Sequence, residues 1–82
     1  MDKLLVEVYV PAISNHYDVF IPRNARVFEL LPLISSAAER LSGSLFSRNY
    51  TALCEGETGR IYSNSMTVEE MKLRNGSRMI LI

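Results

Sequence analysis

The spacing of apolar residues changes once along the chain, and this change constrains the fold more than any other feature of the sequence. Residues 3–10 and 17–21 alternate with a period of two, which is typical of strands that bury one face. The residues expected on the buried faces are Leu4, Val6, Val8, Val10, Tyr17, Val19 and Ile21. The segment PAISNH between these strands supplies turn residues, so the sequence predicts an N-terminal antiparallel hairpin.

After the second strand the apolar residues recur at helical spacing, which predicts one helix. The positions of this stripe are Val27, Leu30, Leu31, Ile34, Ala37 or Ala38, and Leu41. Gly43 lies where a left-handed residue commonly ends a helix. Pro32 conflicts with a straight helix because it lacks an amide donor and crowds the preceding turn. Either the helix begins at Pro32, or the turn 27–31 precedes a kink; the continued stripe favours the second alternative.

The second half of the sequence predicts shorter elements. Strands are expected over residues 50–54, 60–62 and 77–82. Thr67 and Glu70 fit the capping box of a single helical turn, and Asn75-Gly76 predicts a tight turn before the last strand. In the polar connector after the long helix, two apolar residues are expected to close one end of the core, namely Leu45 and Phe46.

The resulting order, β-β-α-β-β-(short helical turn)-β, resembles the ubiquitin-like β-grasp fold, an α+β fold in which a mixed sheet packs on one helix. The match is most specific after residue 65, where the expected core positions are Met71, Leu73, Met79 and Leu81. In length, order and ending the chain is also similar to the small bacterial YukD/EsaB-type proteins of type VII (ESX-like) secretion systems. The resemblance implies a single ubiquitin-like domain over residues 1–82 and a cytosolic accessory or regulatory role in such a system.

Charge and the end of the sequence disfavour two other classes of protein. Nine acidic and nine basic residues give a net charge of zero, which argues against a small nucleic-acid-binding domain. A ubiquitin-like modifier or sulfur carrier would need a C-terminal Gly-Gly, whereas this sequence ends in Ile80-Leu81-Ile82. A single cysteine favours the cytoplasm, and no stretch approaches the ~18 apolar residues of a membrane span.

The residue types do not indicate catalysis. His16 is the only histidine and is expected in the exposed turn between the first two strands. Cys54 is expected to point inward as a small core residue. Paired carboxylates occur only where exposed turns are predicted, at Glu55 and Glu57 and at Glu69 and Glu70. The sequence therefore predicts a non-enzymatic protein with no cofactor and no metal.

The face of the sheet that points away from the helix is the predicted functional surface. By alternation, it is expected to carry Leu5, Tyr9, Phe20, Leu53 and Ile80, with Ile82 as a further candidate. A contiguous apolar patch of this size marks a site of protein binding, so we expect a protein partner, which the resemblance implies is a secretion-system component. A homodimer through this face is the alternative, and scattered exposure without function is the competing interpretation.

Overall fold

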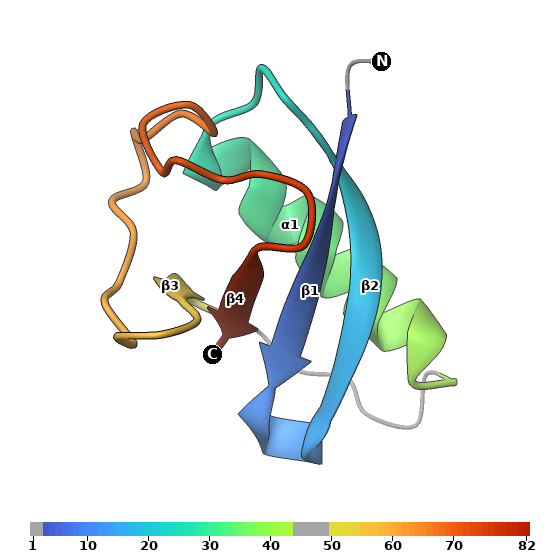
Figure 1. Ribbon diagram of the computed structural model, residues 1–82. Helices are drawn as coiled ribbons and strands as arrows, with labels where there is room; N and C mark the ends of the chain where they lie inside the picture. Colours follow the sequence, from blue (N-terminus) through green and yellow to red (C-terminus); the bar gives the residue numbers. More distant parts are fainter. Residues whose placement is uncertain (1–2, 44–49) are drawn as a thin grey trace.

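The computed structural model describes residues 3–43 and 50–82, which form a four-stranded sheet with one long helix on one face (Figure 1). The elements are β1 (Lys3–Val10), the 3-10 helix η1 (Pro11–Ile13), β2 (Asn15–Pro22), α1 (Val27–Leu41), β3 (Leu53–Glu55) and β4 (Arg78–Leu81). The strand order is β2-β1-β4-β3, with β1 antiparallel to β2 and parallel to β4. The first and last strands are therefore central neighbours. The role expected for Leu45 and Phe46 lies outside the described residues.

The predicted N-terminal hairpin is confirmed. Every residue of β1 is paired with β2, from Lys3 opposite Pro22 to Val10 opposite Asn15. In the turn, Ser14 adopts a left-handed φ of 49°, and its amide donates to the Pro11 carbonyl at 3.1 Å. The predicted inward residues are buried except for Tyr17, which is half-buried.

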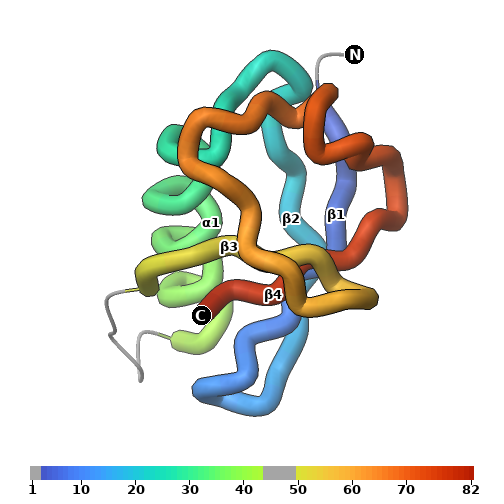
Figure 2. Tube along the Cα trace, turned by 90° about the vertical axis from the view of Figure 1, so that its left-hand side faces the viewer, coloured from blue at the N-terminus to red at the C-terminus, as the bar shows by residue number. Residues whose placement is uncertain are grey.

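Helix α1 begins before Pro32 because another segment of the chain holds its first turn. The amide of Val27 donates to the carbonyl of Met66 at 2.9 Å, and the amide of Phe28 donates to the carbonyl of Asn64 at 3.0 Å. These amides have no acceptor within the helix, so the contacts satisfy donors that would otherwise be unpaired. Both views show the segment between β3 and β4 running to the start of α1 and back (Figures 1 and 2).

The helix ends as the sequence predicts. Gly43 has a φ of 76°, and its amide donates to the carbonyl of Arg40 at 3.1 Å. Leu41, expected on the apolar stripe, is instead 55% exposed. In the described part of the chain, no helix has the length and apolar character needed to cross a membrane.

The strand expected over residues 60–62 does not form. Only an isolated bridge joins Cys54 and Ile61, although the Tyr62 amide still donates to the Leu53 carbonyl at 2.9 Å. The chain must leave the sheet after Tyr62 to reach the start of α1, so its pairing with β3 is limited to this one bridge. The strand before it is also displaced along the sequence, because β3 covers Leu53–Glu55 rather than residues 50–54.

The turns before β4 match the expected chemistry. The Thr67 amide donates to a Glu70 carboxylate oxygen at 2.9 Å, and the Glu70 amide donates to the Thr67 hydroxyl at 3.0 Å, which is a reciprocal capping box. Next, the Asn75 side-chain oxygen accepts from the Leu5 amide at 2.9 Å, and the Gly76 amide donates to the Leu5 carbonyl at 2.8 Å. The Asn-Gly corner is thereby tied to β1.

The core lies between the sheet and α1, as expected for a fold of this order. Its fully buried large side chains come from β1, β2, α1, β3 and β4, and they are Leu4, Val6, Val8, Val10, Ile21, Val27, Leu30, Ile34, Leu53, Met79 and Leu81. Of the core positions expected near the end, Met71, Met79 and Leu81 are buried, and Leu73 packs half-buried against them.

Gly56 is required by a close approach to β4. Its amide donates to the Arg78 carbonyl at 3.0 Å, and a Cβ at this position would lie 2.5 Å from the Arg78 Cβ. We expect Gly56→Ala to lower the free energy of unfolding by about 1–3 kcal/mol, because the turn would have to move off the strand. Urea unfolding of the parent and the variant measures this difference in the free energy of unfolding. Gly59→Asn, where an added Cβ meets no atom within 4 Å, is the control; an equal loss would contradict the prediction.

The capping box makes part of the stability depend on pH. Hydrogen bonds from the Thr67 backbone and side chain lower the pKa of Glu70 from its ordinary value of 4.5. The ionised carboxylate therefore stabilises the folded state fully above that value, and the contribution disappears as the pH falls through the lower folded-state pKa. Glu70→Gln should lower the urea midpoint at about pH 7 and converge with the parent at about pH 2. Glu69→Gln is the control, and a pH-independent difference for Glu70→Gln would contradict this reasoning.

Candidate protein-interaction surface

Strand pairing defines the face of the sheet that points away from α1, which we call the outer face. Residues directly opposite one another in neighbouring strands share a face, so the pairing arranges this surface in rows. The rows are Phe20–Leu5, Asp18–Glu7–Arg78 and His16–Tyr9–Ile80–Cys54. Figure 1 looks onto this face, with α1 behind the strands. Four of the five predicted site residues lie on it, and they are Leu5, Tyr9, Phe20 and Ile80.

The fifth predicted site residue, Leu53, does not belong to this face, and that prediction is wrong. Leu53 is fully buried and lies opposite Leu81, which is also in the core. Cys54 lies opposite Ile80 instead, so the expectation that it points inward is also wrong, although its side chain is buried. The error is one of phase: a shift of one residue moves every side chain of a strand to the other face.

The exposed apolar side chains of the outer face form two separate zones. The first, the Phe20 zone, consists of Phe20, which is 57% exposed, and half-buried Leu5. The second, the Tyr9 zone, consists of exposed Tyr9, exposed Ile61 and half-buried Ile80. Ile61 is 62% exposed and joins this zone through its bridge to Cys54. Sequence reasoning missed Ile61, whose neighbours become evident only once Cys54 is assigned to the outer face.

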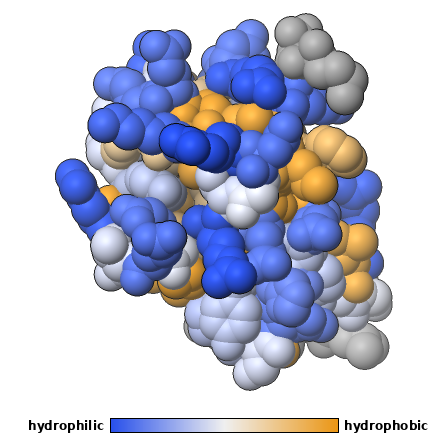
Figure 3. All heavy atoms as spheres, viewed as in Figure 1, coloured by the Kyte–Doolittle hydropathy of each residue, from blue (hydrophilic) through white to orange (hydrophobic). Residues whose placement is uncertain are grey.

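A row of charges separates the two zones. The Arg78 Nε lies 3.3 Å from a Glu7 carboxylate oxygen, and Asp18 lies opposite Glu7 on the other side. Figure 3 shows the consequence: hydrophobic areas on this face are interrupted by hydrophilic side chains. Because the Arg78 side chain is 73% exposed, the ion pair contributes little to stability, about 1 kcal/mol at most. Its significance is that it divides the apolar surface.

Two residues with potential reactivity border the Tyr9 zone. Burial raises the pKa of the Cys54 thiol, which favours the unreactive protonated form. His16 lies in β2 opposite Tyr9 rather than in the turn, and it is exposed as expected. Among residues 3–43 and 50–82, no group of three or more His, Cys, Asp or Glu side chains is placed to hold a metal ion.

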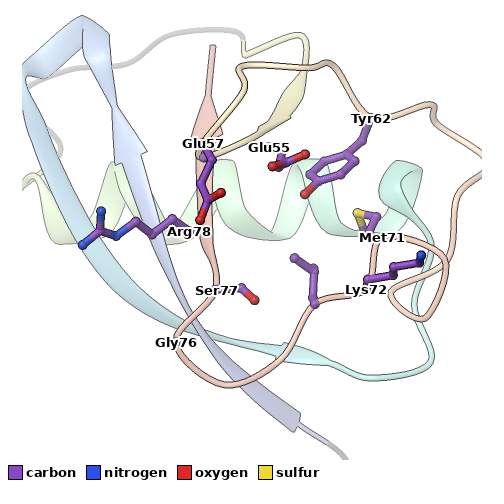
Figure 4. A pocket seen from close by; sticks show the side chains of 10 residues that line it. Glu55, Glu57, Tyr62, Met71, Lys72, Gly76, Ser77 and Arg78 are labelled. Carbon is purple, nitrogen blue, oxygen red and sulfur yellow. The ribbon is translucent and has the colours of Figure 1, made fainter.

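A cleft of about 430 Å³ lies between the turn after β3 and the segment that leads into β4. Figure 4 shows Glu55 and the Tyr62 ring on one side of it, and an Arg78 side chain that extends away from it. Burial, followed by the nearby charge of Glu55, raises the pKa of Tyr62. Lys72 and Glu57 also line the cleft, so charges of both signs face it. This mixture selects no particular class of ligand.

Comparison with known proteins identifies the fold. No family model and no curated protein matches the sequence. Among solved structures, the EccD5 ubiquitin-like domain from Mycobacterium xenopi superposes with a TM-score of 0.81 at 12% identity, covering 100% of this chain and 94% of that one. The ubiquitin-like domain of the Mycobacterium tuberculosis type VII secretion system protein EccD1 has a TM-score of 0.76 at 10% identity, covering 100% and 99%.

A third similar structure is a chain of a monooxygenase complex. A chain of the toluene 4-monooxygenase HD complex has a TM-score of 0.77 at 10% identity, covering 96% of this chain and 95% of that one. At such identities the likeness establishes the fold, and functions are carried by particular surfaces. Together with the mixed sheet packed on one helix, these comparisons show that the chain has the ubiquitin-like β-grasp fold.

Proposed function

We propose that this chain is a non-enzymatic protein-interaction module that binds a protein partner through the Tyr9 zone of its outer face. The observation that carries the proposal is the grouping of Tyr9, Ile80 and Ile61, which come from three separate parts of the chain. Tyr9 and Ile61 are 41% and 62% exposed, so the free protein leaves substantial apolar surface in water. Tyrosine is favoured at protein interfaces because it combines a large apolar ring with a polar hydroxyl.

The charged row beside the Tyr9 zone supports a specific partner. Asp18, Glu7 and Arg78 present charges of both signs next to the apolar side chains. Charges at the rim of an interface orient the partner and disfavour wrong ones more than they add affinity. The Phe20 zone, with Leu5, lies beyond this row and would contribute only to a partner that spans it.

We further propose that the partner is a component of a type VII-like secretion system, for which this protein is a cytoplasmic accessory or regulatory factor. Two considerations support this role. The sequence resembles the bacterial YukD/EsaB-type proteins in element order, and two similar solved domains are those of EccD5 and of EccD1, the latter a type VII secretion protein. A homodimer through the outer face is the alternative, and it predicts self-association without any secretion component.

Photo-crosslinking in cells that carry the secretion genes tests this proposal. A photoreactive residue in place of Ile61 should give an adduct with a secretion component, and Ile80→Asp should weaken the adduct about tenfold by placing a charge in the apolar contact. The matched control is a photoreactive residue in place of Phe28, an exposed side chain on α1. Equal adducts from the two positions would contradict binding through the Tyr9 zone.

Two further measurements separate the secretion role from its alternative. Unchanged secretion in the Ile80→Asp strain would contradict the secretion role. Concentration-dependent dimers that Ile80→Asp abolishes would favour the homodimer.

A further inference from the structure

The corner that leads into β4 is the only place in the sequence where a glycine follows an asparagine. In an Asn-Gly pair the glycine amide nitrogen can attack the asparagine side-chain carbonyl carbon, because the glycine has no side chain to hinder the approach. Asn75 and Gly76 are both exposed, and a Cβ added to Gly76 would meet no atom within 4 Å. Neither steric cover nor exclusion of water therefore protects this pair.

The backbone conformation of the corner opposes the attack. The Ser77 amide donates to the Arg74 carbonyl at 3.0 Å, and Gly76 has a φ of 89°, whereas Asn75 does not adopt a positive φ. These features define a type II turn, in which the second residue has a ψ of about +120°. Closing a five-membered ring between the Asn75 side chain and the Gly76 nitrogen requires a ψ of the opposite sign. The turn must therefore open before the ring can form.

Hydrogen bonds to β1 keep the corner closed. The Leu5 amide donates to the Asn75 Oδ1 at 2.9 Å, and the Gly76 amide donates to the Leu5 carbonyl at 2.8 Å. One residue of β1 thus holds both reacting groups, because it binds the proton of the attacking nitrogen and the oxygen of the carbonyl under attack. A further bond, from the Arg74 amide to the Ser77 hydroxyl at 2.9 Å, stabilises the turn itself. Rotation of the Asn75 backbone toward the ring would break the bonds to Leu5.

We propose that Asn75 is a modification site that is protected while β4 is paired with β1 and that converts to isoaspartate when this contact opens. In the open state a base takes the proton from the Gly76 nitrogen, and this nitrogen forms a bond to the Asn75 Cγ. The bond from Cγ to Nδ2 breaks, and Nδ2 leaves with a proton as ammonia. The product of this step is a cyclic imide.

Water then opens the imide in one of two directions. If water adds at Cγ and the bond from Cγ to the Gly76 nitrogen breaks, residue 75 becomes an ordinary aspartate. If water adds at the main-chain carbonyl carbon and the bond from that carbon to the nitrogen breaks, residue 75 becomes isoaspartate. Either way the chain gains one water and loses one ammonia, and the exposure of Asn75 lets the water reach it.

Isoaspartate would disturb the register of β4. Its backbone runs through Cβ and Cγ, so the chain gains one methylene group before Gly76, and the former main-chain carboxyl becomes the side chain. The contacts to Leu5 fix where β4 begins, and the pairing that follows places Ile80 opposite Tyr9. A longer link cannot keep both the contacts and this pairing. Aspartate has the parent's backbone and an oxygen that still accepts from the Leu5 amide.

This inference goes beyond the proposed function because it assigns a chemical modification, although its consequence for binding rests on that function. Ile80 belongs to the Tyr9 zone, so the isoaspartyl form should bind a partner more weakly. The modification and its effect on β4 are measured without any partner. The two proposals can therefore fail separately.

Mass spectrometry of the peptide that contains Asn75 tests the protection, since a carboxyl in place of the amide raises the mass. At mildly alkaline pH, Asn75 should deamidate at least about a hundredfold faster in urea-unfolded protein than in folded protein. Ser77→Ala removes the bond to the Arg74 amide, so the folded variant should deamidate about fivefold faster than the parent, each relative to its own rate in urea. Ser63→Ala is the matched control, because it removes only a contact between two hydroxyls. Equal rates in folded and unfolded protein, or equal effects of the two substitutions, would overturn the proposal.

Hydrogen exchange of the two products tests the effect on β4. After incubation in urea and refolding, chromatography separates the isoaspartyl form from the aspartyl form. The amides of residues 79–81 should exchange at least about tenfold faster in the isoaspartyl form, whereas the aspartyl form should keep the parent's protection. Asn75→Asp supplies the aspartyl product in pure form and controls for the added charge. Parent-like protection in the isoaspartyl form would overturn the effect on β4, and so would an equal loss in Asn75→Asp, which would assign the disruption to charge.

Discussion

The structure depends on the parallel pairing of β1 with β4 in the middle of the sheet. Parallel neighbours cannot be joined by a tight turn, so the chain must travel away and return before β4 can begin. The return ends at the Asn75-Gly76 corner, where both residues bond to the backbone of Leu5. This contact places Met79 opposite Val8 and turns its side chain into the core. A slip of one residue would expose the whole inward face of β4.

The same return path explains how α1 tolerates a proline in its interior. Pro32 gives up one helical hydrogen bond and would favour a helix that starts there. The passing segment instead supplies acceptors to the amides of Val27 and Phe28, and the Arg26 guanidinium donates to the carbonyl of Ser65 at 2.7 Å. The first turn is thus stabilised by contacts from nearly forty residues further along the chain. Helix and returning segment support each other, which makes the region between β3 and β4 structural in spite of its few regular elements.

The strand register also decides what the surface offers to partners. It brings Asp18, Glu7 and Arg78 into one row and so divides the apolar outer face into two zones. It also turns the Asp18 and Phe20 backbones away from β1, toward the side of β2 with which no strand of the described residues pairs.

The sequence by itself determined the elements whose signals are local. Period two defined β1, β2 and their inward residues, helical spacing defined α1, and the capping box and the Asn-Gly corner located the turns before β4. These succeed because alternation, caps and turn residues act between neighbours along the chain. The end of α1 before Gly43 was also predicted from a local signal, the glycine itself.

Tertiary structure alone decided the rest. The phase of β3 was undetermined because Ala52, Leu53 and Cys54 are all apolar, so only pairing with β4 could send Leu53 inward and Cys54 outward. The strand expected at residues 60–62 was reduced to one bridge by the path of the chain toward α1. The division of the outer face was likewise invisible, because alternation tells which face a side chain occupies but not which side chains of other strands lie beside it.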